Sequence, residues 1–587
     1  MLFADAAGYY ERLEAVPSRL KMIDILAEMF RGLEPEEVAP AIYMTQGILL
    51  PPFEGREFGV AEKLVEEALA LSTGHDKRAV EELYIRKGDM GLAAEELKRS
   101  TRLKGIVRNS YGIREIYSMM MKIAEAGGPG SKDQKIKMLA NMISAASPLE
   151  AKFIARYPLG ALRLGVGDST ILEALALAYT GSREAKPELE RAYNTCSDLG
   201  LVGARLKKEG MRAITDFRIT LFKPVRPALA ERLATAEEIM ERMGGEAAVE
   251  QKYDGFRIQI HKKGGEIRLY SRRLEDTTAM FPDIVDAVRR IRAESAIFEG
   301  EALAYNEETS EYLPFQETIQ RKRKHGIAEK REELPLHLFA FDLLYLNGMD
   351  YLSEPYEKRR DALEALVMGS EVIEPTRRIL TGSPKELERF FETSVSDGLE
   401  GIMVKDLKAP YVAGARKFSW IKLKRSYRGA LTDTLDLVIV GFYSGRGSRA
   451  EFGFGGLLCA VYNRKRDMFE TVSRIGTGFT EAQMTELHRK LERIKRGLKP
   501  ARVDSVVEPR FWVAPKYVVT VNADEITRSP MHTCGRSTDK EGIGYALRFP
   551  RLYGDEAIRP DKGPEEATTT EEVIEMFRMQ RKVGVKE

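Results

Sequence analysis

Cysteine and histidine are scarce in this chain, and their spacing excludes several kinds of site. Only Cys196, Cys459 and Cys534 occur among 587 residues, and no two of them form a CxxC pair. They cannot supply a four-cysteine zinc site or a disulfide framework, so we expect a reducing intracellular compartment. The six histidines form no HxxxH pair, so the helical zinc motif of metalloproteases is absent from the sequence.

Long apolar runs and a charge excess of one sign are also lacking. No apolar stretch approaches the roughly 20 residues that a membrane-spanning helix needs, and Asp5 interrupts the N-terminal apolar residues before a signal peptide could form. Formal net charge is only +2, although charged residues make up 31% of the chain. This balance excludes a uniformly basic surface but allows a local basic groove that could bind nucleic acid.

The chain divides into three regions by the spacing of its apolar residues. Residues 1–220 show apolar residues three and four apart, which predicts an all-α region with helices at 21–30, 60–71, 113–126, 134–145 and 170–178. Two prolines in the run 222–227 forbid a helix and favour an extended linker. Strands alternate with helices over about 247–427, which predicts an α+β domain.

After Asp433 the pattern changes to short strands separated by glycine-rich turns. Alternating or continuous apolar runs occur at 435–443, 457–462, 516–522 and 546–549. Such a series is typical of a small β-barrel. A charged amphipathic helix is expected at 570–582. We therefore predict domains at 1–220, 221–427 and 428–587.

Lys252 is the most informative residue of the sequence. It precedes Asp254-Gly255 and Arg257, and apolar residues alternate on both sides. This pattern predicts strands at 248–251 and 257–261 joined by a tight hairpin turn, with Lys252 and Arg257 at the mouth of one pocket. A lysine in such a place can act as an amine nucleophile on phosphorus if nearby cations lower its pKa.

Further charged clusters follow Lys252 in order along the chain. Taken singly, each has an ordinary explanation, such as a solvated strand face, a salt-bridged edge or an aromatic core residue. Together they provide cations, metal-holding carboxylates and an aromatic face, which are what a nucleoside triphosphate site needs. The clusters are Ser271-Arg272-Arg273, Glu299-Gly300-Glu301, Phe339-Ala340-Phe341-Asp342, Glu400 to Lys405, Trp420 to Lys424, and Arg548 to Arg551 followed by Arg559-Pro560-Asp561-Lys562.

In order and spacing, these clusters resemble motifs I, Ia, III, IIIa, IV, V and VI of the covalent nucleotidyltransferases, and in particular of ATP-dependent DNA ligases. Residues 159–166 also resemble a loop in the helical DNA-binding domain of the archaeal and eukaryotic replicative ligases. The resemblance spans about residues 1–580. It implies an all-α DNA-binding domain, an adenylation domain and an OB-fold β-barrel.

The resemblance implies a reaction in three steps. Lys252 would attack the α-phosphate of ATP and expel pyrophosphate, AMP would pass to the 5′-phosphate of a nick, and the 3′-hydroxyl would then seal the strand. Glu250 and Phe341 would hold adenine, Arg272 and Glu301 the ribose, and Lys422 and Lys424 the α-phosphate. Arg257 and Arg416 would serve the phosphate or the nick. Arg559, Asp561 and Lys562 would orient pyrophosphate.

The implied metal is Mg²⁺, with Mn²⁺ as an alternative, held by Glu400. Where the family commonly has Asp-Gly-Glu, this chain has Glu299-Gly300-Glu301, which keeps the charge on a longer arm and makes Glu299 a second candidate metal ligand. Arg163 and Gly165 are candidate DNA contacts, because glycine allows close backbone approach and arginine supplies charge. The alternative for this loop is a helix-capping turn at Gly167-Asp168.

The sequence favours a DNA ligase over three alternatives. An RNA ligase or mRNA capping enzyme shares the Lys252 motif, but the large helical N-terminal region and the tail at Arg548–Arg551 favour a DNA ligase over both. An NAD-dependent ligase would need a cysteine-ligated zinc element that the three scattered cysteines cannot supply. A non-catalytic nucleic-acid-binding scaffold is the third. The expected partner is nicked duplex DNA, and the expected state is a monomer in the cytoplasm, associated with the nucleoid of a prokaryote, an archaeon by resemblance. A sliding clamp is a candidate partner, although no QxxLxxFF-type motif occurs in the N-terminal region.

Overall fold

A computed structural model gives the fold of the chain. It describes residues 1–582 except 102–110, 161, 234, 307–310, 313–334, 398, 425–433, 445–452, 539–541 and 555–556. These residues form two compact units. Unit 1 comprises Met1–Ala230, Asp254–Thr376 and Asp406–Trp420, and unit 2 comprises Glu231–Tyr253, Arg377–Lys405 and Ile421–Glu587. The domain boundary predicted at 427/428 lies outside the described residues.

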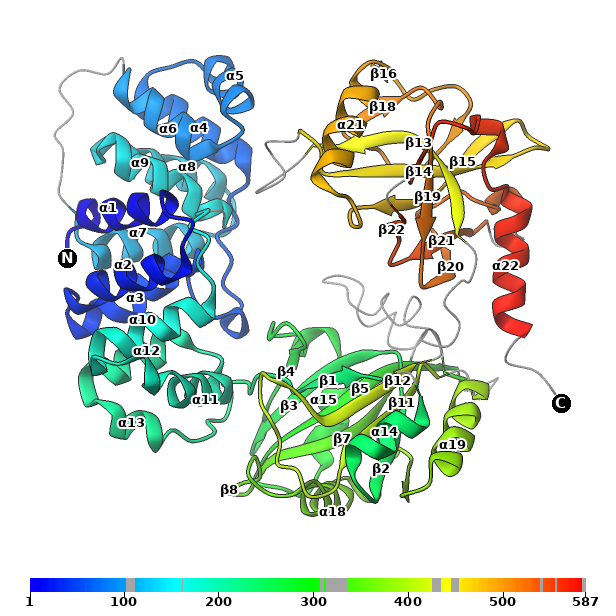
Figure 1. Ribbon diagram of the computed structural model, residues 1–587. Helices are drawn as coiled ribbons and strands as arrows, with labels where there is room; N and C mark the ends of the chain where they lie inside the picture. The colour runs from blue at the N-terminus through cyan, green and yellow to red at the C-terminus, as the bar shows by residue number, and fades with distance from the viewer. Residues whose placement is uncertain are drawn as a thin grey trace. The chain divides into compact units, whose positions relative to one another are not determined.

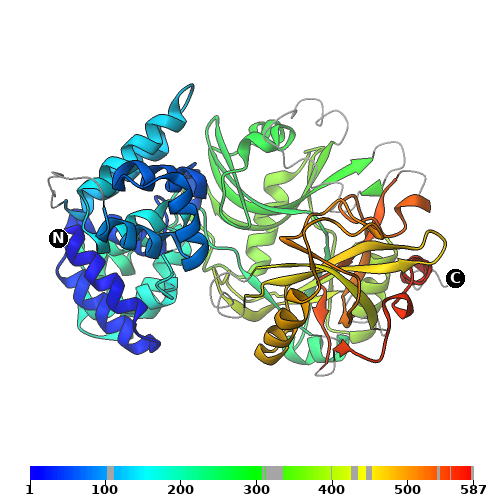
Figure 2. The same cartoon turned by 90° about the horizontal axis from the view of Figure 1, so that it is seen from above.

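The N-terminal part of unit 1 is helical, as the apolar spacing predicts, and Figures 1 and 2 show it in blue to cyan. The predicted helices correspond to α2, α4, α7, α8 and α10. In the described part of the chain, no helix has both the length and the apolar character that a membrane crossing needs. The helices are α1 (Phe3–Glu14), α2 (Arg19–Arg31), α3 (Pro35–Gln46), α4 (Glu62–Thr73), α5 (Lys77–Lys87), α6 (Met90–Arg99), α7 (Ile113–Glu125), α8 (Ser131–Ala145), α9 (Pro148–Arg156), α10 (Asp168–Thr180), α11 (Lys186–Cys196), α12 (Leu199–Glu209) and α13 (Met211–Thr215).

A seven-stranded sheet forms the second part of unit 1. Its strands are ordered β4 (Glu266–Ser271), β3 (Phe256–Lys263), β5 (Ser295–Asn306), β7 (Leu336–Leu346) and β8 (Met349–Asp350), with β6 (Glu311–Tyr312) beside β5 and β9 (Ile373–Pro375) beside β7. Alternate residues share a face. Ile258, Ile260 and Phe298 therefore point into the apolar core with α15 (Pro282–Arg290) and α18 (Tyr356–Val367). Gln259, directly opposite Glu299, lies on the other face.

A five-stranded sheet carries Lys252 on its strand β2. The order is β1 (Leu229–Arg232), β12 (Arg416–Lys424), β11 (Gly401–Asp406), β2 (Ala247–Lys252) and β10 (Arg378–Thr381). Within unit 2, helices α14 (Ala236–Met243) and α19 (Pro384–Ser396) pack on its apolar face. The chain passes between the two units within β1, β11 and β12, and also at 253/254 and 376/377.

The predicted hairpin at Asp254-Gly255 is wrong. Strands β2 and β3 belong to different sheets, so the turn does not join paired neighbours. Gly255 has no positive φ. Its small size is nevertheless required, because a Cβ there would lie 2.4 Å from the carbonyl oxygen of Ala302 and 2.8 Å from Cγ of Leu303. The period-two pattern found both strands but could not distinguish a hairpin from a crossing between sheets.

The C-terminal part of unit 2 is rich in strands, as predicted, and its main sheet curls into a half-barrel (Figure 2). Predicted strands 435–443, 457–462, 516–522 and 546–549 correspond to β13, β14, β19 and β21, and the last predicted helix is α22. The elements are β13 (Leu435–Tyr443), β14 (Gly456–Asn463), β15 (Met468–Ile475), α21 (Glu481–Glu492), β16 (Lys495–Arg496), β17 (Val503–Asp504), β18 (Phe511–Val513), β19 (Val518–Asn522), β20 (Glu525–Ser529), β21 (Gly544–Arg548), β22 (Arg551–Leu552), β23 (Ile558–Arg559) and α22 (Thr570–Lys582).

Candidate functional site

Lys252 lies at the end of β2 in a cluster of two lysines around one carboxylate. Its Nζ is 2.6 Å from Oε2 of Glu400, and Lys424 pairs with Oε1 of the same side chain. The backbone N–H of Glu400 donates to the carbonyl of Lys252 at 3.0 Å, which fixes the start of β11 against the end of β2. Burial alone would raise the pKa of Glu400, but the two ammonium groups lower it below its usual value.

This cluster differs from the expected environment of Lys252 in one respect. The sequence suggested cations close to Lys252, whereas the contact that the structure describes for it is with a carboxylate, that of Glu400. Lys424 reaches the cluster through Glu400. Before Lys252 can act as a nucleophile, its contact with Glu400 must therefore change.

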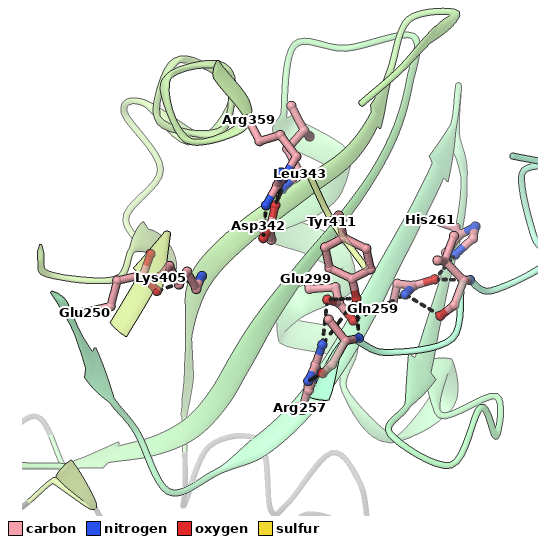
Figure 3. A network of polar contacts seen from close by, with 12 residues as sticks. Glu250, Arg257, Gln259, His261, Glu299, Asp342, Leu343, Arg359, Lys405 and Tyr411 are labelled. Atoms are coloured by element: carbon pink, nitrogen blue, oxygen red, sulfur yellow. Dashed lines mark hydrogen bonds and ion pairs between the residues drawn. The ribbon is translucent and has the colours of Figure 1, made fainter. Parts of the chain in front are cut away.

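Glu250, two residues before Lys252 on the same strand, is buried. Its Oε2 lies 2.9 Å from Nζ of Lys405 on β11, and the two side chains are 2% and 1% exposed. Figure 3 shows this pair. Lys405 was not among the predicted site residues, although it lies one residue before the end of β11, the strand that follows Glu400. A buried lysine is rarely found without a carboxylate partner, so its position within an apolar strand was the available signal.

Arg257 lies on β3 in unit 1, among groups that the sequence identified only in part (Figure 3). It donates to Glu299 at 2.8 Å and to the carbonyl of Ala228 at 2.8 Å. Its guanidinium lies 5.2 Å from the ring centre of Phe341 and 5.6 Å from that of Trp420. Within the described residues, its buried Nε–H has no hydrogen-bond partner.

Two partners of Glu299 were missed by the sequence analysis. Tyr411 donates its hydroxyl to Oε2 of Glu299 at 2.7 Å, and Gln259 donates to Oε1 at 3.3 Å. Glu299 has an exposed side-chain fraction of only 1%. The signal for Gln259 was its position, two residues after Arg257 on the same strand face. Nothing in the sequence pattern pointed to Tyr411, because it comes from a distant loop.

The other predicted residues of the nucleotide site lie on two strands, β5 and β12, and in one turn. Glu301 accepts the backbone N–H of Gly255 at 3.2 Å. Arg272 lies exposed in the turn after β4, and Lys422 is half-buried on β12. Arg416 begins β12, and its side chain lies outside the described part.

The three predicted pyrophosphate residues form an ionic cluster in the C-terminal part of unit 2. Arg559 pairs with Asp561 at 2.6 Å and lies 3.6 Å from Asp436 on β13. Lys562 pairs with the same oxygen of Asp436. The Arg559 guanidinium lowers the pKa of Asp561 to about 2. Asp436 was not predicted, and it pairs with both cations in the described structure.

The predicted DNA-binding loop lies between α9 and α10. Arg163 and Gly165 both have positive φ, 58° and 67°. The guanidinium of Arg163 is 2.9 Å from Asp89 and donates to the carbonyl of Gly88, with 38% of the side chain exposed. The capping alternative is also compatible with the structure, because Gly167 is the N-cap residue of α10.

The donor set of Glu400 fits Mg²⁺. Within the described ranges, no group of three or more His, Cys, Asp or Glu side chains lies close enough to hold a metal ion by itself. Mg²⁺ commonly keeps several waters and binds through one or two carboxylates together with substrate phosphates, so a single accessible carboxylate suffices. Glu299 does not fit as a direct ligand in this arrangement, because its side chain is only 1% exposed and both oxygens accept hydrogen bonds in the interior. The side chain of Glu400 is 19% exposed, and Mg²⁺ would replace a lysine contact there.

Comparison with known proteins covers all three regions of the chain. Family models match residues 2–176 (DNA ligase N terminus), 227–424 (ATP dependent DNA ligase domain) and 450–562 (ATP dependent DNA ligase C terminal region). A probable DNA ligase of Dictyoglomus turgidum is 47% identical over 588 residues, which cover 100% of this chain and 99% of the relative. A DNA ligase of Saccharolobus solfataricus is 42% identical over 593 residues, 99% of this chain and 98% of the relative.

One solved structure, Pmar-Lig_PreS3, is similar in fold. It is 17% identical, has a TM-score of 0.55, and the match covers 94% of this chain and 99% of that one. The relatives come from bacteria and archaea, so the archaeal source stays a prediction. The RNA ligase, capping enzyme and non-catalytic readings are not favoured by these matches. The chain belongs to the ATP-dependent DNA ligases, enzymes that seal nicks in duplex DNA.

Proposed function

We propose that Lys252 is the nucleophile of this ligase and that Glu400 controls its protonation. ATP is the cosubstrate of the family, and Mg²⁺ is its usual metal. The observation that carries the proposal is the cluster of Lys252, Glu400 and Lys424, in which one carboxylate lies 2.6 Å from the candidate nucleophile and also pairs with a second lysine.

The steps follow from the chemistry of these side chains. Glu400 pairs with the Lys252 ammonium ion until ATP is bound, and one Nζ proton then passes to the Glu400 carboxylate, 2.6 Å away, and on to water before the amine attacks the α-phosphate. Lys424 then faces the phosphate oxygens as negative charge accumulates on them. When bound, Mg²⁺ stabilises charge on the transferring phosphate. The new P–N bond joins AMP to Lys252 as the bond to pyrophosphate breaks.

The remaining roles are proposed residue by residue. Glu250 holds adenine by hydrogen bonding and Phe341 by stacking. Arg257 binds a ligand group as well, and its buried Nε–H, which has no hydrogen-bond partner in the described residues, supports this role. Arg272 and Glu301 serve the ribose, Lys422 the α-phosphate, and Arg416 the phosphate or the nick. Arg559, Asp561 and Lys562 orient pyrophosphate in the first step only. Arg163 and Gly165 contact the DNA backbone.

The roles of the three predicted domains and the partners of the protein are also proposals. The regions 1–220, 221–427 and 428–587 act as DNA-binding, adenylation and OB-fold domains, and the curled C-terminal sheet supports the last assignment. Nicked duplex DNA is the partner that membership in the ligases implies. We expect a monomer in the cytoplasm, and a sliding clamp remains a candidate partner.

Adduct formation tests the nucleophile directly. Protein incubated with ATP labelled at the α-phosphate is expected to carry an acid-labile label, which Lys252→Ala abolishes. Sealing of a pre-adenylated nick should survive at least in part, because that step needs no free amine. Lys263→Ala, on an exposed lysine of β3, is the matched control and should keep full labelling. An acid-labile AMP adduct on Lys252→Ala would exclude the assignment.

A further inference from the structure

The segment 222–228, which links the helical part of unit 1 to its sheet, is held through its backbone at intervals of three residues. The N–H of Phe222 donates to Nδ1 of His261 at 2.9 Å. The N–H of Val225 donates to Oε1 of Gln259 at 2.8 Å, and Gln259 Nε2 donates back to the Val225 carbonyl at 2.9 Å. The N–H of Ala228 donates to the hydroxyl of Tyr411 at 2.9 Å.

The intervening residues of the same segment contact the helices. Lys223 pairs with Asp198 at 3.0 Å, the carbonyl of Pro224 accepts the hydroxyl of Ser197 at 2.6 Å, and the N–H of Arg226 donates to the carbonyl of Asn194 at 2.8 Å. A period of three is that of a polyproline II helix, which Pro224 and Pro227 favour; Phe222, at the start of the segment, has a positive φ of 65° and precedes this conformation. The linker is therefore held on two sides.

His261 and Gln259 have no alternative orientation in this network. Because the Phe222 N–H donates to Nδ1, the ring proton must be on Nε2, where it donates to Gln259 Oε1 at 2.9 Å. Gln259 Oε1 then accepts two hydrogen bonds and Nε2 donates two, the second to Glu299 at 3.3 Å. Both side chains are at least 97% buried, so water does not satisfy these groups.

The network ends on the guanidinium of Arg257. Glu299 accepts from Gln259 on one oxygen and from Arg257 and Tyr411 on the other. Arg257 also donates to the carbonyl of Ala228, at the end of the linker. Figure 3 shows Gln259, Glu299, Arg257 and Tyr411 connected in this way. The linker and Arg257 are thus joined through one buried carboxylate.

We propose that Gln259 and His261 are positioning residues that recognise the backbone of residues 222–228 and, through Glu299, fix the guanidinium of Arg257. In this arrangement Glu299 is the acceptor at the centre of the network. Docking of the linker, and so of the helices that hold it, determines whether Arg257 is aligned for its reaction. The inference rests on the proposed role of Arg257 at the phosphate or the nick.

The first test measures amide hydrogen exchange in the linker and does not depend on the ligase activity of the protein. In the full chain, Gln259→Met removes both hydrogen bonds to Val225, and hydrogen exchange followed by mass spectrometry over residues 217–229 should be at least about tenfold faster. Gln483→Met is the matched control, because Gln483 on α21 is also buried and bonds two backbone groups, Thr480 N–H and the Gly554 carbonyl. It should leave exchange of the linker unchanged. Unchanged exchange in Gln259→Met would overturn the proposal.

The second test separates positioning from a structural role. Single-turnover sealing of a pre-adenylated nick should slow about tenfold in Gln259→Met. A residue that acts through Arg257 causes no further loss once Arg257 is gone, so Arg257→Ala with Gln259→Met should be no slower than Arg257→Ala alone. Multiplicative rate losses, or a normal sealing rate beside a loosened linker, would refute the positioning role.

A second variant covers the case in which Gln259→Met does not fold. Gln259→Glu keeps the shape and both acceptor hydrogen bonds but cannot donate to Val225 or Glu299, and it should give the same direction in both measurements. Unaltered exchange and sealing in Gln259→Glu would contradict the proposal. Failure of the proposed function would look different, because wild-type protein would then form no Lys252–AMP adduct while exchange of the linker still responded to Gln259.

Discussion

The ion pair between Asp342 and Arg359 offers a sharp test of how the sheet of unit 1 is held. Asp342 follows Phe341 on β7, and both of its oxygens accept from Arg359 on α18, at 2.7 and 3.1 Å. Both side chains are 0% exposed (Figure 3). Arg359 also donates to the carbonyls of Glu354 and Ala409. We change Arg359 to Met, which keeps much of the volume and removes the charge.

The expected loss is large because the carboxylate of Asp342 would stay buried without its counter-ion. Breaking a buried pair by removing one partner costs about 3–5 kcal/mol. The two carbonyls add about 1–3 kcal/mol each if water does not reach them. Unit 1 is larger than the domains for which the shift is about 2–4 °C per kcal/mol, so about 1–2 °C per kcal/mol applies. The ion-pair term alone then lowers Tm by roughly 3–10 °C. Asp342→Leu combined with Arg359→Met removes both charges, so we expect it to be less destabilised than the sum of the single variants by about 2–3 kcal/mol.

Tryptophan fluorescence makes this assay specific. The chain has two tryptophans, Trp420 and Trp512. A Trp512→Phe background leaves Trp420, whose ring centre lies 6.0 Å from that of Phe341 and 5.9 Å from that of Tyr411. Guanidinium unfolding followed by Trp420 then reports on unit 1. A loss below about 1 kcal/mol for Arg359→Met, or strictly additive losses in the double variant, would refute the reasoning.

Three further predictions follow from other ionic contacts. Arg559→Ala and Lys562→Ala should slow formation of the AMP adduct and spare sealing of pre-adenylated DNA; equal losses in both assays would contradict the assignment. Asp436→Asn should lower the KM for ATP by up to about fivefold, because it removes an ion pair worth up to about 1 kcal/mol. Arg163→Ala should reduce the slope of log affinity for nicked duplex against log salt by about 0.9, while the exposed control Arg212→Ala leaves it unchanged; an unaltered slope in Arg163→Ala excludes a phosphate contact. Burial lowers the pKa of His261 from 6.5 to about 3. Between these two pH values the unfolded chain binds a proton that the folded chain does not, so the free energy of unfolding should decrease as the pH falls from 6.5 towards 3. Urea unfolding of His261→Gln should depend less on pH than that of wild type, and an identical dependence would refute this explanation.

Periodicity and motif order predicted much of the fold because both are local. The helices of residues 1–220 and the strands around Lys252 were found from spacing, and their bounds agree with the structure within a few residues. The hairpin at Asp254-Gly255 failed for a physical reason. Whether two successive strands pair depends on what the rest of the chain places beside each, and Gly255 is required by the approach of Ala302, 47 residues later.

The candidate site shows the same division between local and distant information. Strand alternation placed Glu299 and Glu301 on one face, and the register confirms that they face Gln259 and Arg257. The partners that the sequence missed, Tyr411 and Lys405, come from segments far along the chain. A pattern of charges identifies which residues are costly to bury, but the residues that neutralise them are determined by tertiary pairing.

Most of the predicted site cations are paired with carboxylates of the protein itself. Six of the predicted cations already have a carboxylate partner in the described structure: Lys252 and Lys424 with Glu400, Arg257 with Glu299, Arg559 and Lys562 with Asp436, and Arg163 with Asp89. Each partner offsets the cost of holding a cation in a partly dehydrated place. Phosphate binding to these groups would then exchange one anion for another rather than neutralise a bare charge. The protein carboxylates are fixed in position, whereas the phosphates of ATP and DNA arrive with the substrate. The free energy that a triphosphate or a nick gains from these cations must therefore exceed the free energy of the ion pairs that it replaces.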